Sequence, residues 1–428
     1  MTHFLLYTES YPSRAADSPR QTGIGRYCSD LATGLTALGH RVAVLTNDDR
    51  APAAGDGPSE PVVERAGREP RWPHQLLYRA RTLRRRLEKE RPDYLLVGDP
   101  VAHQVVALAG LPEDVRYCSL FYGTELRAYR DLIASTRWHP VRKLRRRLLT
   151  TYIGRAYQPV VISRYTARCL DALGLPHRPE CIVFPAVGER FLTQPAGVVA
   201  IDDPRARGSS VADEGATRFI TVARLSERKN QLQVLETLAA LKRQHGLRFE
   251  YLIVGNVDST EHKSYLASIM RFVRENALED SVRVVEHATD AEKIAWIDAS
   301  DVFVMLSRTV GHSVEGFGIS VIEASCRGKP VVVSDEGGMP ETILEARTGF
   351  SVPIEAGDRL AAILLDLARE PGLRRALGAA GRRFVHDNFT PRRMAERLTA
   401  QLDARHPTRH PAPIPHRPRH RTQTPVHS

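Results

Sequence analysis

The stretch Glu315-Gly316-Phe317-Gly318-Ile319-Ser320-Val321-Ile322-Glu323 runs into a mostly apolar segment that Gly328 and Pro330 close. A glycine turn followed by such a run predicts a short helix over about 318–327. The next residues, Val331-Val332-Val333, indicate a buried strand. A helix that leads directly into a buried strand is typical of α/β folds with parallel sheets.

The same stretch also has the properties of a ligand site. A helix N-terminus presents free backbone N–H groups and a partial positive charge, which suit phosphate. Glycines let the ligand approach the backbone closely. Glu315 lies in the turn and Glu323 on the helix. The arrangement therefore suits a ligand with an anionic middle and hydroxylated ends, such as a nucleotide-sugar.

Strand and helix patterns alternate on both sides of this segment. Residues 3–46 read strand, glycine loop, helix, strand, which is a βαβ unit. Further strands are expected at 94–97, 115–120, 159–163, 218–223, 250–255, 282–285, 302–305 and 330–334, and helices at 230–244, 260–277, 290–299 and 357–369. We therefore expect two Rossmann-like, doubly wound α/β domains facing across a cleft, with ligands beyond the carboxyl ends of the strands.

Five segments follow from this pattern. We expect an N-terminal domain over 1–192, a polar linker over 193–216 and a second domain over 217–388. A helix over 389–404 is expected to pack back on the first domain. Residues 405–428 are rich in Pro, Arg and His without any acid, and such a composition predicts a disordered tail.

Composition excludes several classes of protein. The chain has 428 residues, a net charge of +11 and five scattered cysteines without a C-x-x-C pair. A disulfide framework or zinc site is not indicated, and a cytoplasmic location fits. No apolar run is long enough for a transmembrane helix, and no signal peptide is recognisable. Nucleic-acid binding has no aromatic platform or known module to support it.

A second cluster of polar residues follows the first expected strand of the second domain. Arg224 and Lys229 lie in the loop Arg224-Leu225-Ser226-Glu227-Arg228-Lys229 before the next helix. An Arg fork and a Lys point charge at a strand end are suited to hold a diphosphate. Together with Glu315 and Glu323, they predict a donor site in the second domain.

These segments, with Ile253-Val254-Gly255, Gly328-Lys329-Pro330, Gly337-Gly338-Met339-Pro340-Glu341 and Thr348-Gly349-Phe350, resemble those of the retaining glycosyltransferases of family 4, which have the GT-B fold. The resemblance implies that Arg224 and Lys229 neutralise the donor diphosphate. It implies that Glu315 lies against the transferred sugar and that Glu323 binds the ribose. Gly316, Phe317 and Gly318 would offer backbone N–H groups, with Gly255 bordering the nucleotide.

The resemblance also assigns residues of the first domain to the acceptor and phosphate side. Gly23 and Gly25 match the family's N-terminal glycine loop. Members often carry His-Gly-x-Glu or His-Gly-x-Asp after the fourth strand, but this chain has Tyr122-Gly123-Thr124-Glu125. A phenol can bond a sugar hydroxyl, yet with a pKa near ~10 it is a poor general base. Glu125 is then the nearest acceptor-side carboxylate.

Metal ions and partners complete the expectations. No Asp-x-Asp motif follows a strand, and the Arg/Lys pair makes a divalent ion unnecessary, so we expect neither a metal nor a cofactor besides the donor. Two Arg-rich helical runs, 79–87 and 141–149, are either solvated faces or contacts with the inner face of a membrane. Asn256, Glu286 and His287 are expected to border the base pocket, with uracil and guanine both open.

The sequence therefore predicts a metal-independent, retaining transferase that moves a sugar from a nucleoside diphosphate sugar to a hydroxyl acceptor. Lipid, polysaccharide and small-metabolite acceptors all remain open. Two alternatives are kept: a catalytically inactive nucleotide-sugar-binding protein, suggested by Tyr122, and a nucleotide-sugar epimerase of the same fold.

Overall fold

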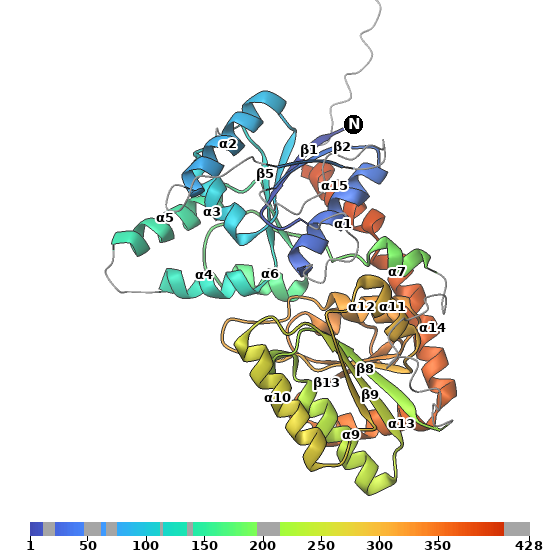
Figure 1. Cartoon of the computed structure of the whole chain (residues 1–428). Coiled ribbons are helices and arrows are strands. Elements are labelled where there is room, and N and C mark those ends of the chain that lie inside the picture. Colours follow the sequence, from blue (N-terminus) through green and yellow to red (C-terminus); the bar gives the residue numbers. More distant parts are fainter. Residues whose placement is uncertain are drawn as a thin grey trace, which may run out of the picture.

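A computed structural model of the chain describes residues 1–11, 22–46, 61–65, 75–111, 114–134, 140–194 and 215–405. These residues form two parallel sheets, one in each half of the chain, with helices on both faces (Figure 1). The expected doubly wound α/β architecture is confirmed. Most of the expected linker 193–216 and all but the first residue of the expected tail lie outside the described residues.

The first sheet has the strand order β3-β2-β1-β4-β5-β6-β7. Its strands are β1 (His3–Thr8), β2 (Arg41–Thr46), β3 (Val62–Arg65), β4 (Tyr94–Val97), β5 (Tyr117–Phe121), β6 (Gln158–Val161) and β7 (Cys181–Ile182). Alternate residues of β1 pack on opposite faces, because Phe4 and Leu6 join one apolar cluster while Leu5 and Tyr7 join another. Burial on both faces explains the continuous apolar run.

Helices enclose this sheet. They are α1 (Gly23–Ala37), α2 (Gln75–Glu90), α3 (Pro100–Ala109), α4 (Thr124–Ala134), α5 (Pro140–Arg155) and α6 (Arg164–Asp171). The short helix α7 (Glu189–Thr193) instead packs against α12 (Ile319–Cys326) of the second domain. The start of α1 is fixed locally, since the Thr22 hydroxyl accepts a hydrogen bond of 3.1 Å from the Gly25 N–H. A Cβ on Gly25 would lie 3.3 Å from the Ser10 carbonyl oxygen, so the start of α1 lies close to the end of β1.

The second sheet has the equivalent order, β10-β9-β8-β11-β12-β13. Its strands are β8 (Thr217–Val222), β9 (Phe249–Gly255), β10 (Val282–Glu286), β11 (Val302–Met305), β12 (Val331–Ser334) and β13 (Gly349–Val352). The helical elements around it are η1 (Glu227–Lys229), α9 (Gln231–His245), α10 (Thr260–Glu275), α11 (Asp290–Asp298), α12 (Ile319–Cys326), η2 (Met339–Thr342) and α13 (Gly357–Arg369). The strands expected at 250–255 and 302–305, and the helix expected at 357–369, are confirmed.

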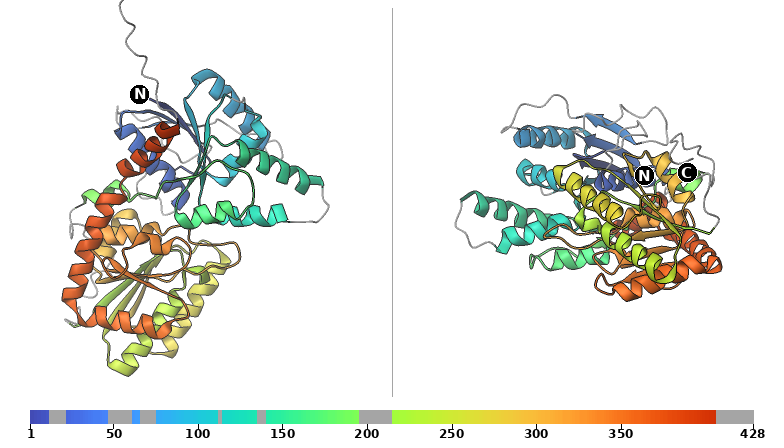
Figure 2. Two further views of the ribbon diagram at one scale, coloured as in Figure 1. Left: turned by 180° about the vertical axis from the view of Figure 1, so that it is seen from behind. Right: turned by 60° about the horizontal axis from the view of Figure 1, so that its bottom comes forward.

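The chain returns to the first domain at its end. Helix α14 (Pro371–Asn388) runs along the second domain, and α15 (Pro391–Arg405) lies beside α1 in both views (Figures 1 and 2). The approach is close, because a Cβ on Gly34 of α1 would lie 2.0 Å from the Pro391 carbonyl oxygen. A backbone hydrogen bond of 2.8 Å from Val187 to Phe389 supports the crossing.

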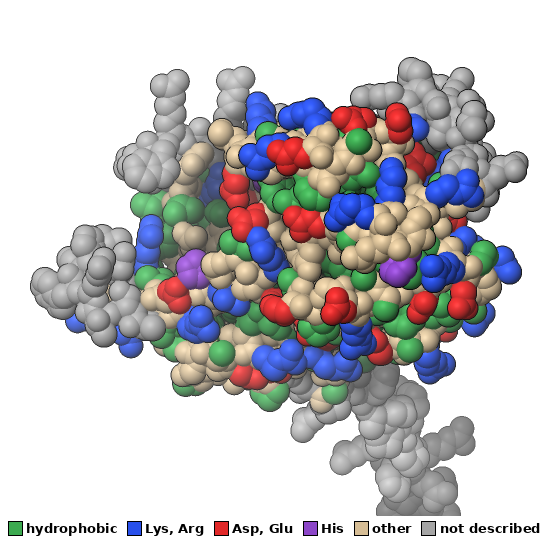
Figure 3. All heavy atoms as spheres, turned by 90° about the horizontal axis from the view of Figure 1, so that it is seen from below, with side chains coloured by type: hydrophobic (Ala, Val, Ile, Leu, Met, Phe, Trp, Pro, Cys, Tyr) green, Lys and Arg blue, Asp and Glu red, His purple; other side chains and the backbone are tan. Residues whose placement is uncertain are grey.

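Surface properties add two facts. Among the described residues, no helix combines the length and apolarity that crossing a membrane requires. The face of the molecule at the end of the second domain carries acidic and basic side chains intermingled, rather than one basic patch (Figure 3).

Candidate active site

A cavity of about 540 Å³ lies between the two domains, at the carboxyl ends of both sheets. It is lined by Thr22, Gly23, Ile24, Arg26, Tyr27, Tyr122, Thr124, Glu125, Ile162 and Pro185 from the first domain. The second domain supplies Val222–Arg224, Arg228, Lys229, Val254–Asn256, Ala288, Lys293, Met305, Val314–Ser320 and Glu323. The segments that follow β1, β5, β8 and β9 therefore meet here. Ligands of doubly wound folds bind at such a place, beyond the carboxyl ends of the strands where the order of each sheet reverses.

Glu315 is the centre of a partly buried charged cluster in this cavity. Its Oε2 accepts a hydrogen bond of 2.8 Å from Arg228 Nη1 and a very short one from Lys229 Nζ. The Ser307 hydroxyl adds a contact of 3.3 Å to the same oxygen. One carboxylate oxygen thus holds both cations at the end of η1.

The pKa values of Glu315 and Lys229 are both lowered, but for different reasons. Burial alone would raise the pKa of Glu315, but Lys229 and Arg228 outweigh it and lower the value to about 2. Burial lowers the pKa of Lys229 to about 8, although Glu315 opposes the shift. Glu315 is consequently ionised at neutral pH, and Lys229 is protonated but titrates only slightly above it.

The start of α12 forms one wall of the cavity. Gly318 caps this helix without any side-chain hydrogen bond and has φ of 110°, a conformation that glycine tolerates. A Cβ on Gly316 would lie 2.1 Å from the Tyr122 carbonyl oxygen, so this position admits no side chain. The Phe317 ring is buried, with its centroid 5.6 Å from that of Phe184. The backbone of this turn therefore faces the cavity.

Glu323 lies one helical turn further along α12, in a second charged cluster. Its carboxylate is buried, and burial raises its pKa, while Lys293 and Arg26 oppose that shift. Arg26 comes from α1 of the first domain, and its Nη1 lies 2.9 Å from Asp290 Oδ2 at the start of α11. Asp290 also pairs with Lys293. Both domains thus contribute charge around Glu323.

The first domain differs in part from the sequence expectations. Gly23 lines the cavity, but Gly25 does not and lies buried within α1. The Tyr122 hydroxyl donates a hydrogen bond of 2.6 Å to the Gly98 carbonyl. Burial also raises the pKa of Tyr122 well above its usual value. The phenol is therefore occupied as a structural donor.

Glu125 is likewise engaged with the backbone. Its Oε1 accepts a very short hydrogen bond from the Tyr122 N–H and a second one of 3.3 Å from the Gly123 N–H. Burial raises its pKa. The carboxylate lines the cavity while it organises the turn after β5.

Two of the four residues that were expected to border the base line the cavity. Gly255 and Asn256 line the cavity, and Ala288 joins them. A Cβ on Gly255 would lie 1.8 Å from the Ala223 carbonyl oxygen, which explains the glycine. Glu286 and His287 are exposed and are not among the residues that line the cavity, so their place beside the base stays a prediction.

Three charged residues of the site were not predicted. Arg228 directly precedes Lys229, which was predicted as a site residue. The sequence does not show which of these adjacent cations face Glu315. Lys293 pairs with Asp290 on the same helix, α11, whereas Arg26 meets Asp290 only through the tertiary fold, because the two residues lie 264 positions apart in the sequence. For Arg26 the available signal was its place directly after the glycine loop.

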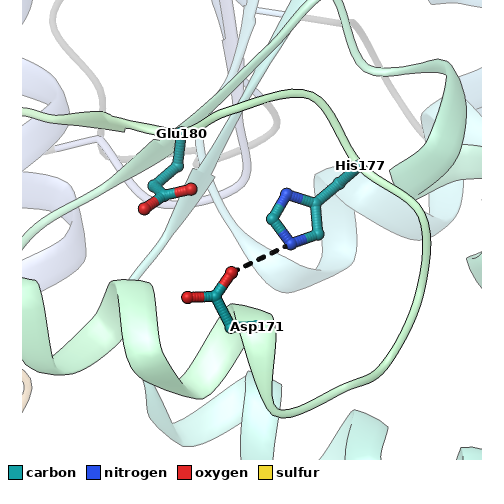
Figure 4. Close-up of side chains that lie close together, drawn as sticks. All are labelled: Asp171, His177 and Glu180. Carbon is teal, nitrogen blue, oxygen red and sulfur yellow. Dashed lines mark ion pairs between the residues drawn. The ribbon is translucent and has the colours of Figure 1, made fainter.

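One group among the described residues could hold a metal ion, and it lies away from the cavity. Asp171, His177 and Glu180 place their ligand atoms within 4.8 Å of one another (Figure 4). Asp171 is the last residue of α6, whereas Ile162, before the start of that helix, lines the cavity. The cavity itself carries the cations Arg224, Arg228 and Lys229.

Comparison with known proteins connects this geometry to a family. The model described as "Glycosyl transferases group 1" matches residues 202–384, and that described as "Glycosyltransferase Family 4" matches residues 21–187. A GDP-mannose-dependent alpha-(1-6)-phosphatidylinositol monomannoside mannosyltransferase of Mycolicibacterium smegmatis is 31% identical over 56% of this chain. The amylovoran biosynthesis glycosyltransferase AmsK of Erwinia amylovora is 34% identical over 36% of it.

These alignments span 60% and 36% of the relatives' own lengths, respectively. Solved structures match over a longer part of the chain. Sucrose-phosphate synthase from Thermosynechococcus elongatus has a TM-score of 0.70 at 20% identity, covering 95% of this chain and 100% of that one. The Anabaena protein HepE in complex with UDP-glucose has a TM-score of 0.68 at 16% identity, covering 94% and 100%. The shared fold is the two-domain GT-B fold.

Proposed function

Because the chain belongs to the glycosyltransferases of the family 4 type, with the GT-B fold, we propose that it transfers a sugar from a nucleoside diphosphate sugar to a hydroxyl acceptor. The observation that carries this proposal is the partly buried Arg228–Glu315–Lys229 cluster beside the start of α12, where no side chain caps the helix. Cations and free N–H groups on one side of the cavity suit a diphosphate.

In this proposal the second domain binds the donor. Arg224, Arg228 and Lys229 contact the diphosphate and stabilise the negative charge that develops as it leaves. Glu323 binds the ribose hydroxyls. These fixed cations supply the charge stabilisation that a divalent ion provides in other transferases, so transfer proceeds without a metal.

Glu315 then acts as an ionised group rather than as an acid or base at neutral pH. With a pKa of about 2 it keeps its negative charge, and it stabilises positive charge on the transferred sugar. Glu125 and Tyr122 already bond to backbone groups. We therefore propose a retaining reaction on the front face, in which the departing diphosphate accepts the proton of the acceptor hydroxyl.

The donor base and the sugar remain to be identified by experiment. The name of one relative specifies GDP-mannose, and one structural neighbour is bound to UDP-glucose. Both nucleotides belong in a first screen, with hexoses as the expected sugars.

A lipid acceptor is supported by the surface of the first domain. Helix α5 projects from this domain (Figure 1) and exposes Lys143, Leu144 and Arg145–Arg147. In α2, by contrast, Arg79 pairs with Glu9 and Arg86 with Glu64. We propose that α5 contacts anionic membrane surfaces. Co-sedimentation with phosphatidylglycerol vesicles tests this, and binding that survives charge reversal at Arg145–Arg147 would contradict it.

The test of the function is a panel of nucleotide-sugars incubated with candidate acceptors. Release of nucleoside diphosphate together with a glycosylated product supports the proposal. Tight nucleotide binding without turnover would favour an inactive binding protein. An isomerised sugar formed without any acceptor would favour an epimerase.

A further inference from the structure

Two sets of contacts between the domains lie near the cavity, and neither uses a residue that is assigned to the donor. One involves Glu341, on the η2 turn of the second domain, and the other involves Arg26 on α1 of the first domain. Each contact links one domain to the other across the cleft.

Glu341 caps a helix of the opposite domain. Its two carboxylate oxygens accept hydrogen bonds of 2.9 Å from the Arg164 and Tyr165 N–H groups, the first two of α6. The third N–H, that of Thr166, bonds to the Ser163 hydroxyl within the first domain. A carboxylate is well placed at a helix N-terminus, and only closed domains allow this one to reach it.

The turn that carries Glu341 also supports the donor loop. The Gly338 N–H donates a hydrogen bond of 2.9 Å to the Glu315 carbonyl. A Cβ on Gly337 would lie 2.2 Å from that carbonyl oxygen, and one on Gly338 would lie 2.1 Å from the Gly316 carbonyl oxygen. Because this packing leaves no space, the position of η2 and the position of the Glu315 loop are linked.

Arg26 makes the second contact between the domains. Its guanidinium pairs with Asp290 at 2.9 Å and lies 3.7 Å from Asp30 on its own helix. The side chain is 16% exposed, and Gly188 makes room for it, since a Cβ there would lie 1.8 Å from Nη2. Asp290 is bound in turn to Lys293, which lines the cavity beside Glu323.

We propose that Glu341 and Arg26 are positioning residues that hold the two domains closed over the donor, Glu341 by capping α6 and Arg26 by pairing with Asp290. This inference rests on the proposed function, since closure excludes water from a reaction in which water competes with the acceptor. It assigns to Glu341 and Arg26 a role in directing the sugar to the acceptor instead of to water.

The experiment compares Glu341→Gln with Glu345→Gln in the full chain. Glu345 lies in the same segment, and its carboxylate bonds to Ser351 and Arg359 within the second domain, so it controls for the loss of a charge. We expect Glu341→Gln to lower sugar transfer about tenfold, a loss of ~1.4 kcal/mol, and to raise the ratio of donor hydrolysis to transfer several-fold. Glu345→Gln should leave both unchanged.

An unchanged ratio of hydrolysis to transfer in Glu341→Gln would overturn the proposal, because a merely destabilised protein loses both reactions equally. Small-angle X-ray scattering adds a readout that requires no turnover. With UDP or GDP bound, the double variant Glu341→Gln/Arg26→Lys should have a larger radius of gyration than the wild type. Equal radii would also overturn the proposal. Absence of any sugar transfer by the wild type would instead contradict the proposed function, while the scattering comparison still tests closure.

Discussion

Replacing Glu315 with Gln separates the charge of this residue from its shape. The carboxylate is held by Arg228 and Lys229, and its pKa is lowered from 4.5 to about 2. A shift of this size corresponds to ~3 kcal/mol of stability. Since the folded pKa lies below the unfolded one, this contribution is present above pH ~4.5 and disappears as the pH falls toward ~2.

The substitution should therefore destabilise the protein at pH 7 without unfolding it. A loss of ~3 kcal/mol lies within the 5–15 kcal/mol of a typical domain and lowers the melting temperature by ~6–12 °C. The difference between wild type and variant should shrink below pH ~4.5. Thermal unfolding followed by circular dichroism at several pH values measures this. Glu355→Gln, at an exposed position of the same domain, is the control.

Transfer and nucleotide binding should respond in opposite directions. We expect transfer to fall at least ~100-fold, or ~2.7 kcal/mol, because the charge facing the sugar is lost. Nucleoside diphosphate should bind ~10-fold more tightly, since Arg228 and Lys229 no longer neutralise a carboxylate. Removing one negative charge at ~5 Å from the diphosphate favours binding by up to ~3 kcal/mol at an effective dielectric of ~20. The gain is smaller than this because Lys229, without the Glu315 carboxylate, has a lower pKa and must take up a proton when the diphosphate binds.

Isothermal titration calorimetry with UDP and GDP, and product analysis by chromatography, measure the two effects. Wild-type transfer by Glu315→Gln would refute the role of the ionised carboxylate. Weaker binding of the nucleoside diphosphate by this variant would refute the view that Glu315 and the diphosphate share the same cations.

Three further predictions concern pH, metal ions and the C-terminal residues. Burial lowers the pKa of Lys229 to about 8, so kcat/KM for the donor should fall as the pH rises through ~8. Lys229→Arg should remove this decline. If kcat/KM of that variant still falls above pH ~8, the titration belongs to another group. EDTA should leave the transfer rate unaltered, and a strict requirement for added Mg²⁺ would contradict the proposed role of Arg224, Arg228 and Lys229. Truncation after Arg405, which keeps α15 whole, should leave turnover within ~2-fold of the full chain, and a large loss would assign a function to the removed residues.

Much of the fold could be predicted because its strands are buried on both faces. Runs such as Val331-Val332-Val333 remain apolar along their whole length, and the expected helix at 318–327 matches α12 (Ile319–Cys326) within a residue at each end. The short strands at the sheet edges were missed. β7 consists of only Cys181 and Ile182, and β3 spans Val62–Arg65 within a Pro- and Gly-rich region. Their pairing depends on the neighbouring strand rather than on their own pattern.

The site was predictable where a motif places functional residues close together in the sequence. The turn Glu315–Gly318 and the loop Arg224–Lys229 both line the cavity, except for the intervening residues 225–227. Contacts between distant segments were not predictable, as with Arg26 and Asp290. The direction of a side chain was also beyond the sequence, because nothing in the stretch around Tyr122 indicates that its hydroxyl bonds to Gly98.

The central claim is that the cation cluster serves transfer from a nucleoside diphosphate sugar. Its most direct test is the release of nucleoside diphosphate from a panel of UDP- and GDP-sugars by the wild type and by Lys229→Ala, with candidate lipid and sugar acceptors present. We predict that the wild type releases nucleoside diphosphate from at least one donor and forms a glycosylated product, and that Lys229→Ala does so at least ~100-fold more slowly. Nucleotide binding without release by the wild type, or equal release by the folded variant, would contradict it.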